Sequence, residues 1–476
     1  MSTYTSATDA DRRAMLDAIG VDSVDALFAD IPAAIRLGRG LDLPAGMAEQ
    51  EVYAHLRDLA ARNVSAEDEV SFLGAGMYDS YVPALIDSII LRSEFLTPYT
   101  PYQPEISQGG LQVMFEYQTA ISELTGLPVS NASVYEGPSA VGAAGYLAKL
   151  ANGRPRVLAS RGVHPHSRET LTTLARGYGQ VVEEVPLAGG VTDLDALVAA
   201  VGDDVSAVVL QQPNFLGSVE DVAALAAAAK QHGAVVICAC DPIPLGILQP
   251  PGEQGVDIAV GEGQTLGNRL DFGGPSFGFF AASQEHIRRM PGRIAGETTD
   301  VDGRRGFVLT LQTREQHIRR EKATSNICTA QALNALAGVI YLSWLGRRGL
   351  VELGELLVQR TAYARDRLTA IDGVTALHEA PVVRELALRL DADVDAVVER
   401  LAGEGINAGY RLGRSYPEYA DGLLVAITEQ RSRADIDRLA DALERAVAEL
   451  RGGAAAPHAN GVVREAAATT GAGAGR

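Results

Sequence analysis

The pattern of apolar and polar positions divides the chain into three regions. Between residues 9 and 63 the chain is polar, and the segments 9–20, 23–31 and 47–63 have helical spacing. From about residue 130 to 280, helical patterns alternate with short apolar runs rich in β-branched residues. From about residue 330 to 450, a long apolar helix precedes further helices and short strands. The three regions therefore predict different architectures.

The middle region predicts a sheet. Its apolar runs are expected strands at 156–160, 180–185, 205–212, 234–240, 257–263 and 276–282, and its expected helices are 139–152, 167–179, 193–201 and 219–233. Strands that alternate with helices form βαβ units, so we expect an α/β fold whose mostly parallel sheet is covered on both faces. Ligands of such sheets bind beyond the carboxyl ends of the strands, where Gln211, Gln212, Asn214 and Asp241 fall.

These patterns predict four parts along the chain. They are a helical N-terminal segment at 1–70, a large α/β domain at 71–330, a linking helix with a small α+β domain at 331–451, and a disordered tail at 452–476. The tail is low in complexity and rich in Gly and Ala, which predicts no packed core there.

Charge and cysteine content narrow the functional class. The formal net charge of −19 argues against nucleic acid or an anionic membrane as the main partner. Three cysteines without metal-type spacing suit a reducing cytosol. The first residues lack a basic start followed by an apolar run, and no apolar stretch is long enough for a membrane helix. We therefore expect a cytoplasmic protein without a membrane span.

The glycine-rich stretch "GEGQTLG" at 261–267 follows a predicted strand and suggests a ligand loop. A dinucleotide fingerprint is excluded because Gly261, Gly263 and Gly267 have the wrong spacing and no helix follows them. The other ligand considered is pyridoxal phosphate (PLP). Asp241 ends a strand, where a carboxylate can hold the pyridine nitrogen of PLP, although an Asp before Pro242 also suits a simple turn.

No lysine stands where a PLP-binding lysine is expected. In the aminotransferase-like fold this lysine follows the next strand, roughly twenty residues after the aspartate. The residue 23 positions after Asp241 is Gln264, whose neutral amide cannot form a Schiff base. The chain has three lysines, and Lys149 and Lys230 lie on predicted helices. Lys322, in a basic cluster near predicted loops, supports the alternative hypothesis of a self-sufficient PLP enzyme.

Two further stretches carry candidate side chains. "RGVHPHSR" brings His164, His166 and Arg168 to a strand end, but no acidic or cysteine partner is near, so we predict no metal site. The stretch from 99 to 110 is held extended by X-Pro steps. Its polar and aromatic residues suit a binding surface better than a helix cap alone: Tyr99, Thr100, Tyr102, Gln103, Glu105, Ser107 and Gln108.

Long motifs over residues 5–447 resemble the glycine cleavage system P-protein family, and most closely the first subunit in organisms that split this enzyme into two chains. The motifs are "SFLGAGMYDSYVPA", "YTPYQPEISQG", "FEYQTAISELTG", "NASVYEGPSA", "VVLQQPNFLG", "VGEGQTLGNRLDFGGP", "SYPEYADGLLVAITEQR" and the stretch 290–336. The resemblance implies an aminotransferase-like fold (PLP fold type I) and part of a glycine dehydrogenase (aminomethyl-transferring).

The resemblance also implies partners and a division of roles. The complex decarboxylates glycine with PLP and passes the aminomethyl group to the lipoyl arm of the H-protein. In the split enzyme, an (αβ)2 heterotetramer, the PLP lysine belongs to the second subunit, so this chain would bind no cofactor covalently. We therefore expect a degenerate cofactor pocket formed by Asp241, Gln264 and His164, and no catalytic residue. The 99–108 loop is expected near the active site or the subunit interface.

The chain departs from the family pattern at a few positions. Ser80 replaces the more frequent His in "YDxY", Pro138 and Ser139 replace a "GAT" or "ATA" step, and Ala330 replaces Asn in "SNICTxQ". These departures leave open a paralogue that acts on another amino acid or carrier. A structural partner without chemistry is the remaining hypothesis.

Overall fold

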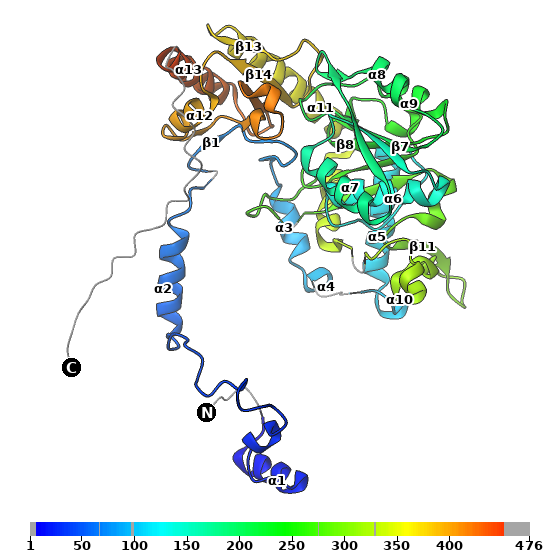
Figure 1. Ribbon diagram of the computed structural model, residues 1–476, viewed down its shortest axis with the longest axis vertical. Helices are drawn as coiled ribbons and strands as arrows, with labels where there is room; N and C mark the ends of the chain where they lie inside the picture. Colours follow the sequence, from blue (N-terminus) through cyan, green and yellow to red (C-terminus); the bar gives the residue numbers. More distant parts are fainter. Residues whose placement is uncertain (1–5, 66, 97–99, 275, 328–329, 452–476) are drawn as a thin grey trace, which may run out of the picture. The chain divides into compact units, whose positions relative to one another are not determined.

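The computed structural model describes residues 6–65, 67–96, 100–274, 276–327 and 330–451 (Figure 1). By its internal contacts the chain divides into two compact units, Met1–Val64 and Ser65–Arg476. The tail at 452–476, expected to be disordered, lies outside the described residues. Within the described part, no helix has the length and hydropathy needed to cross a bilayer.

The described residues of the first unit form two α-helices and bury no side chain. α1 (Asp9–Ile19) begins at a capping box between Thr8 and Asp11 and ends at Gly20, whose φ of 82° is left-handed. α2 (Glu49–Ala60) begins where the Glu51 side chain accepts a hydrogen bond from the Ala48 N–H. The helix expected at 23–31 is only a 3-10 turn at Asp25–Phe28. None of the described residues of this unit is buried.

The second unit is built on a seven-stranded sheet with the order β2-β10-β9-β8-β7-β3-β4. The strands are β2 (Val129–Ser130), β3 (Arg156–Ser160), β4 (Val181–Val185), β7 (Val205–Gln212), β8 (Val235–Cys240), β9 (Ile258–Glu262) and β10 (Gly278–Ala282). The five strands from β9 to β4 run parallel, and β10 is antiparallel to both of its neighbours. All six strands expected in this region are present, and the mostly parallel sheet is confirmed.

Alternate residues of each central strand point into separate cores on the two faces of the sheet. On β7, Val208 and Leu210 join one core, whereas Ala207 and Val209 join the other. Residues of α5 (Gln108–Thr125), α9 (Val222–Lys230) and α8 (Leu194–Ala200) lie in the first core. Residues of α6 (Gly137–Asn152) and α7 (Pro165–Gly177) lie in the second. Both faces are therefore covered, as a parallel sheet requires.

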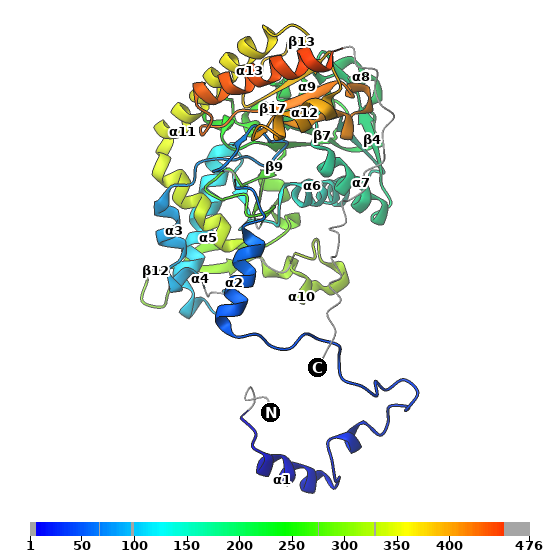
Figure 2. The same ribbon diagram turned by 90° about the vertical axis from the view of Figure 1, so that its left-hand side faces the viewer.

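A long helix leads to a smaller layer of strands and helices (Figure 2). α11 (Ala332–Thr369) is interrupted at Gly346, whose φ of 61° is non-helical. It is followed by the antiparallel sheet β13-β14-β17-β16 and the helices α12 (Val394–Ala402) and α13 (Arg433–Leu450). The strands are β13 (Val374–Ala376), β14 (Glu385–Leu390), β16 (Tyr410–Arg411) and β17 (Gly422–Ala426). This is the expected α+β arrangement.

The remaining elements are short. β1 (Val70–Ser71) pairs in parallel with β15 (Ile406–Asn407), and two hairpins join β5 (Leu187–Ala188) to β6 (Val191–Thr192) and β11 (Ile294–Thr299) to β12 (Arg305–Thr310). The short helices are α3 (Ala84–Ile90), α4 (Ser93–Leu96) and α10 (Gln316–Arg319). The β1–β15 pair brings the segment that follows residue 70 to the smaller sheet and next to the carboxyl edge of the main sheet.

Candidate functional site

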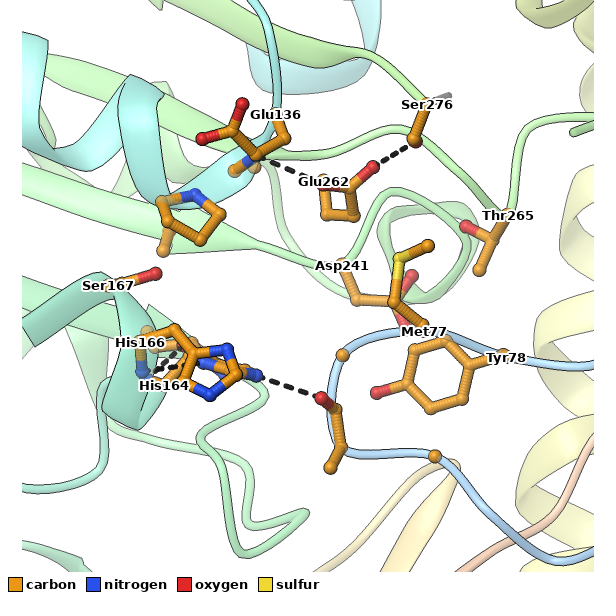
Figure 3. Close-up of a pocket in the computed structure, with 18 of the residues that line it drawn as sticks. Met77, Tyr78, Glu136, His164, His166, Ser167, Asp241, Glu262, Thr265 and Ser276 are labelled. Atoms are coloured by element: carbon orange, nitrogen blue, oxygen red, sulfur yellow. Dashed lines mark hydrogen bonds between the residues drawn. The ribbon is translucent and has the colours of Figure 1, made fainter. Parts of the chain in front are cut away.

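A cavity of about 540 Å³ opens at the carboxyl edge of the main sheet (Figure 3). Its walls come from the ends of β7, β8 and β9, the N-termini of α6 and α7, the segment 74–78 and the start of β14. Its charged and polar lining residues include Tyr78, Tyr135, Glu136, His164, His166, Gln211, Asn214, Asp241, Glu262, Thr265, Ser276, Gln331, Arg384 and Glu385. This is the edge at which ligands of α/β sheets bind.

Asp241, which follows β8, is paired with an arginine from the smaller sheet. Arg384 Nη1 donates to Asp241 Oδ2 over 2.8 Å, and only 2% of the arginine side chain is exposed. The guanidinium lies 4.4 Å from the centre of the Tyr78 ring, a cation–π contact. Burial raises the pKa of Asp241, and the nearby Arg384 opposes that rise. The carboxylate thus already has a cationic partner within the chain.

Glu385 extends this buried cluster. Its carboxylate accepts hydrogen bonds from the Tyr78 hydroxyl at 2.8 Å and from the Ala75 N–H at 2.7 Å. Burial raises the pKa of Glu385 to about 7, although both hydrogen bonds favour the charged form. Through Arg384 and Glu385, the smaller sheet is tied to the segment 74–78 and to the end of β8.

Gln264 is fully buried and is not among the residues that line the cavity. Its Oε1 accepts from the Tyr78 N–H at 2.9 Å, and its Nε2 donates to the carbonyls of Tyr78 at 3.0 Å and Asn268 at 2.8 Å. Three of the four hydrogen-bonding capacities of the amide are therefore used on backbone groups. Gln264 stands at the position where the spacing places a PLP lysine, and its side chain instead holds the backbone of Tyr78 by hydrogen bonds.

The N-terminus of α6 faces the cavity and carries two carboxylates of the chain. Glu262 Oε2 accepts from the Gly137 N–H at 3.0 Å, and Glu136 Oε1 accepts from the Ser139 N–H at 3.0 Å. Ser276 donates its hydroxyl to Glu262 as well. Burial raises the pKa of Glu262, and these donors oppose that rise. A helix N-terminus attracts anions, and here internal carboxylates already satisfy it.

His164 lies on the opposite wall, at the start of α7. Its Nε2 is 2.8 Å from the Ala75 carbonyl and therefore carries the proton, whereas its Nδ1 accepts from the His166 N–H at 3.1 Å. The ring meets Phe215 edge-on, with centroids 5.0 Å apart. Burial lowers the pKa of His164 to about 4, so the imidazole is neutral at neutral pH.

We expect the imidazole of His164 to remain neutral when the pH is lowered from 8 to 5. The unfolded chain binds a proton below its ordinary pKa of 6.5, whereas the folded chain binds it only near 4. Stability therefore falls as the pH drops from 6.5 towards 4. NMR of the ring, assigned with His164→Gln, checks this expectation, and a titration midpoint above 6 would contradict the buried, neutral state.

The described residues around this cavity do not fit PLP. None of the three lysines lines the cavity, the carboxylate that could hold a pyridine nitrogen is paired with Arg384, and the helix N-terminus that could hold a phosphate is occupied by Glu262 and Glu136. A phosphate there would meet two carboxylates at close range. Of the three predicted pocket residues, Asp241 and His164 share the cavity, and Gln264 contacts it only through Tyr78.

Two other candidates from the sequence lie elsewhere. Lys322 lines a separate surface hollow with Tyr146, Arg288 and Arg319, so it has no access to Asp241 within the described structure. Within the same described residues, no group of three or more His, Cys, Asp or Glu side chains is arranged to hold a metal ion. His164 and His166 both line the cavity, and Arg168 pairs with Glu184.

The glycines of "GEGQTLG" serve packing. A Cβ on Gly261 would lie 2.2 Å from the Cys240 carbonyl, and a Cβ on Gly263 would lie 2.3 Å from the Phe277 ring. The backbone of this stretch therefore packs against β8 and against the ring of Phe277, which directly precedes β10. Gly261 lines the cavity, and no phosphate loop is formed.

The loop expected to form a binding surface lies outside the cavity and is anchored by side-chain contacts. Tyr99 lies outside the described residues. Tyr102 accepts a hydrogen bond from Arg293 Nη2 at 2.8 Å. The guanidinium of Arg293 also lies 5.2 Å from the centre of the Tyr102 ring, in a cation–π contact. Gln108 bonds both the N–H and the carbonyl of Phe307 on β12. None of the described residues Thr100, Tyr102, Gln103, Glu105, Ser107 and Gln108 lines the cavity.

Sequence reasoning missed the residues that close the site. Arg384 and Glu385 enter from the smaller sheet, and Glu262 reaches the helix N-terminus from the glycine-rich stretch. One signal was available, because Arg384 and Glu385 stand together near the start of the mostly apolar stretch "VRELALRL". Charged residues in an apolar strand are rarely buried unless they are paired.

Comparisons with known proteins agree with this architecture. A protein-family model described as "Glycine cleavage system P-protein" matches residues 2–443. The "Probable glycine dehydrogenase (decarboxylating) subunit 1" of Moorella thermoacetica (strain ATCC 39073 / JCM 9320) is 50% identical, over 93% of this chain and 99% of the relative. The protein of the same name from Geobacillus thermodenitrificans (strain NG80-2) is 48% identical, over 92% and 98%.

Solved structures share the fold. The crystal structure of glycine decarboxylase (P-protein) of the glycine cleavage system, in inhibitor-bound form, superposes with a TM-score of 0.85 and 44% identity, over 94% of this chain and 100% of that chain. A glutamate decarboxylase from Lactobacillus brevis CGMCC 1306 matches with a TM-score of 0.66 at 14% identity, over 90% and 99%. The latter likeness concerns the fold alone, which is that of PLP-dependent enzymes of fold type I.

Proposed function

This chain belongs to the glycine cleavage system P-protein family, and on that premise we propose that it is the subunit of a two-chain glycine decarboxylase that does not carry the cofactor. The observation that carries the proposal is that the chain's own side chains already engage the polar groups of the cavity that could hold PLP. Gln264 holds Tyr78, Arg384 neutralises Asp241, and the carboxylates of Glu262 and Glu136 cap α6. A family member with this cavity requires a second chain for the chemistry.

In the proposed complex, PLP is bound by a lysine of the second subunit. Bound PLP supplies the electron sink that stabilises the carbanion left when glycine loses its carboxylate. The aminomethyl group then passes to the lipoyl arm of the H-protein. This chain contributes surface and orientation, and glycine and the lipoylated H-protein are its proposed partners together with the second subunit in an (αβ)2 assembly.

We assign the loop from Thr100 to Gln108 to the partner's active site or to the interface beside it. Gln108 and Tyr102 anchor the loop on β12 and on Arg293, so its described residues are held by contacts within this chain, which favours binding by a preorganised surface. Gln103 and Glu105 are exposed, and within the described part of the chain their side chains form no hydrogen bond or ion pair. Polar side chains on a fixed loop suit a site completed by a second chain.

Reconstitution tests the function. The second subunit with H-protein is expected to catalyse glycine–bicarbonate exchange at least ten-fold faster when this chain is added. Glu105→Gln and Gln103→Ala should each lower the exchange rate about ten-fold or more, because each removes a polar group on the proposed site loop.

The matched control is Gln112→Ala, which removes an exposed amide on α5 that bonds only Glu116 in the described structure. It should leave exchange within about two-fold of the wild type. No gain on addition of the wild-type chain would reject the proposed function. Unchanged turnover in both loop variants, with assembly intact, would instead favour a purely structural partner.

A further inference from the structure

The first unit has apolar side chains and nowhere of its own to bury them. Sixteen large hydrophobic side chains between Met15 and Val64 are exposed, against seventeen in the whole remainder of the described chain. The unit spans about an eighth of the sequence, so exposed hydrophobic residues are several-fold denser there. Scattered exposed hydrophobics are ordinary, whereas a concentration of this kind marks an interaction surface.

The apolar residues of α2 form one stripe. Val52, Leu56 and Leu59 are spaced i, i+4 and i+7, which places them on one side of the helix, and all three are exposed. Gln50 and Ala61 lie on the opposite side by the same periodicity. The helix thus has the pattern of an element that packs on a partner.

The two helices are too short to be stable without packing. α1 has 11 residues and α2 has 12, lengths at which an isolated helix is marginal in water. Nevertheless α1 has a full capping box and a left-handed glycine at its C-terminus. These helices have well-defined ends but bury no side chain within the unit. This combination indicates that the sequence is adapted to pack the helices against a surface outside the unit.

Charge and family membership narrow the class of partner against which this segment packs. Residues 6–64 carry ten acidic and six basic side chains, which disfavours an anionic membrane surface. The family match begins at residue 2, so the segment belongs to the family architecture. Its sixteen exposed large hydrophobic side chains provide apolar surface of the kind that a stable protein interface buries, at ~800 Å² per partner.

We infer that residues 6–64 form a clasp that packs the apolar stripe of α2, and the apolar residues around it, onto the second, cofactor-bearing subunit. This inference rests on the proposed two-chain enzyme. The clasp obtains its hydrophobic core from the partner, and the partner in turn holds this chain by a segment separate from the cavity and from the 100–108 loop. Burial of the stripe supplies affinity, and the acidic residues around it stay solvated.

The experiment compares Leu56→Asp/Leu59→Asp with the matched control Gln50→Asp/Ala61→Asp in the full-length chain. Both double variants add two negative charges within α2 and its C-cap residue, but only the first changes the stripe. Affinity for the second subunit is measured by sedimentation velocity or calorimetry. We expect the stripe variant to bind at least about 100-fold more weakly and the control to bind within about three-fold of the wild type.

Two further measurements distinguish packing of the clasp on the second subunit from packing on another surface. The isolated stripe variant should melt within about 2 °C of the wild type, since the inference places the stripe on the partner and not on the chain's own second unit. Trypsin should cut the isolated chain after Arg36, Arg39 or Arg57, and the second subunit should protect these sites. Equal affinities of the stripe and control variants would overturn the inference.

Other results would also overturn it. A lower melting temperature of the isolated stripe variant would show that the segment packs on its own chain. Loss of a homodimer in that variant would show that a second copy of this chain is the occupant. If the wild-type chain does not bind the second subunit at all, the proposed function itself fails, and that outcome is distinct from tight binding by the stripe variant.

Discussion

Replacement of Arg384 by alanine is expected to lower the free energy of unfolding by about 3–5 kcal/mol, because it leaves the carboxylate of Asp241 buried without its counterion. The pair is almost completely buried, with side-chain exposures of 2% and 14%. The same change also removes the cation that lies over the Tyr78 ring. Urea denaturation of the isolated chain, monitored by circular dichroism, measures the loss.

Arg389 provides the matched control, because it lies on β14, which Arg384 directly precedes, and pairs with Asp421 at the surface. Arg389→Ala should cost less than about 1 kcal/mol, as exposed ion pairs do. The double variant Asp241→Asn/Arg384→Leu removes both charges and should cost less than the sum of the single changes Asp241→Asn and Arg384→Leu. Equal losses for Arg384→Ala and Arg389→Ala would contradict the buried pair as the tie between the two sheets.

Gln264→Lys is expected to produce no lysine-bound PLP. The lysine would stand at a fully buried position, where Oε1 no longer accepts from the Tyr78 N–H and an ammonium group is placed among backbone carbonyls. The unpaired N–H alone costs about 1–3 kcal/mol, so the variant should also be less stable by at least ~2 kcal/mol. Phosphate binding remains opposed by Glu262 and Glu136 at α6.

The measurement is the visible absorption of the variant mixed with PLP, followed by borohydride reduction and mass spectrometry of the peptide around position 264. Gln264→Met serves as the control for stability, because it keeps the volume and adds no charge. A stoichiometric reduced adduct on the lysine of the variant would mean that the cavity accepts PLP, although internal side chains engage the groups that could hold it. The same assay on the wild-type chain should give no adduct at Lys322.

Most of the fold could be predicted from the sequence, because the signals for helices and strands lie in neighbouring residues. Apolar runs rich in β-branched residues located six of the seven strands of the main sheet but not the two-residue strand β2, and the helical patterns between them located helices of both faces. The antiparallel direction of β10 was not readable from its apolar run. A strand buried on both faces has the same composition in either direction, and its orientation depends on the chain that leads into it.

By itself, the sequence determined that this chain is an α/β protein of the P-protein family and that Gln264 stands where a lysine would be needed. Only the tertiary structure decided what occupies the rest of the site. Asp241 and Arg384 are 143 positions apart, and Gly137 and Glu262 are 125 apart. Periodicity and spacing report neighbours within a few turns, whereas the partner of a buried charge is set by which distant strands and helix ends the fold brings together.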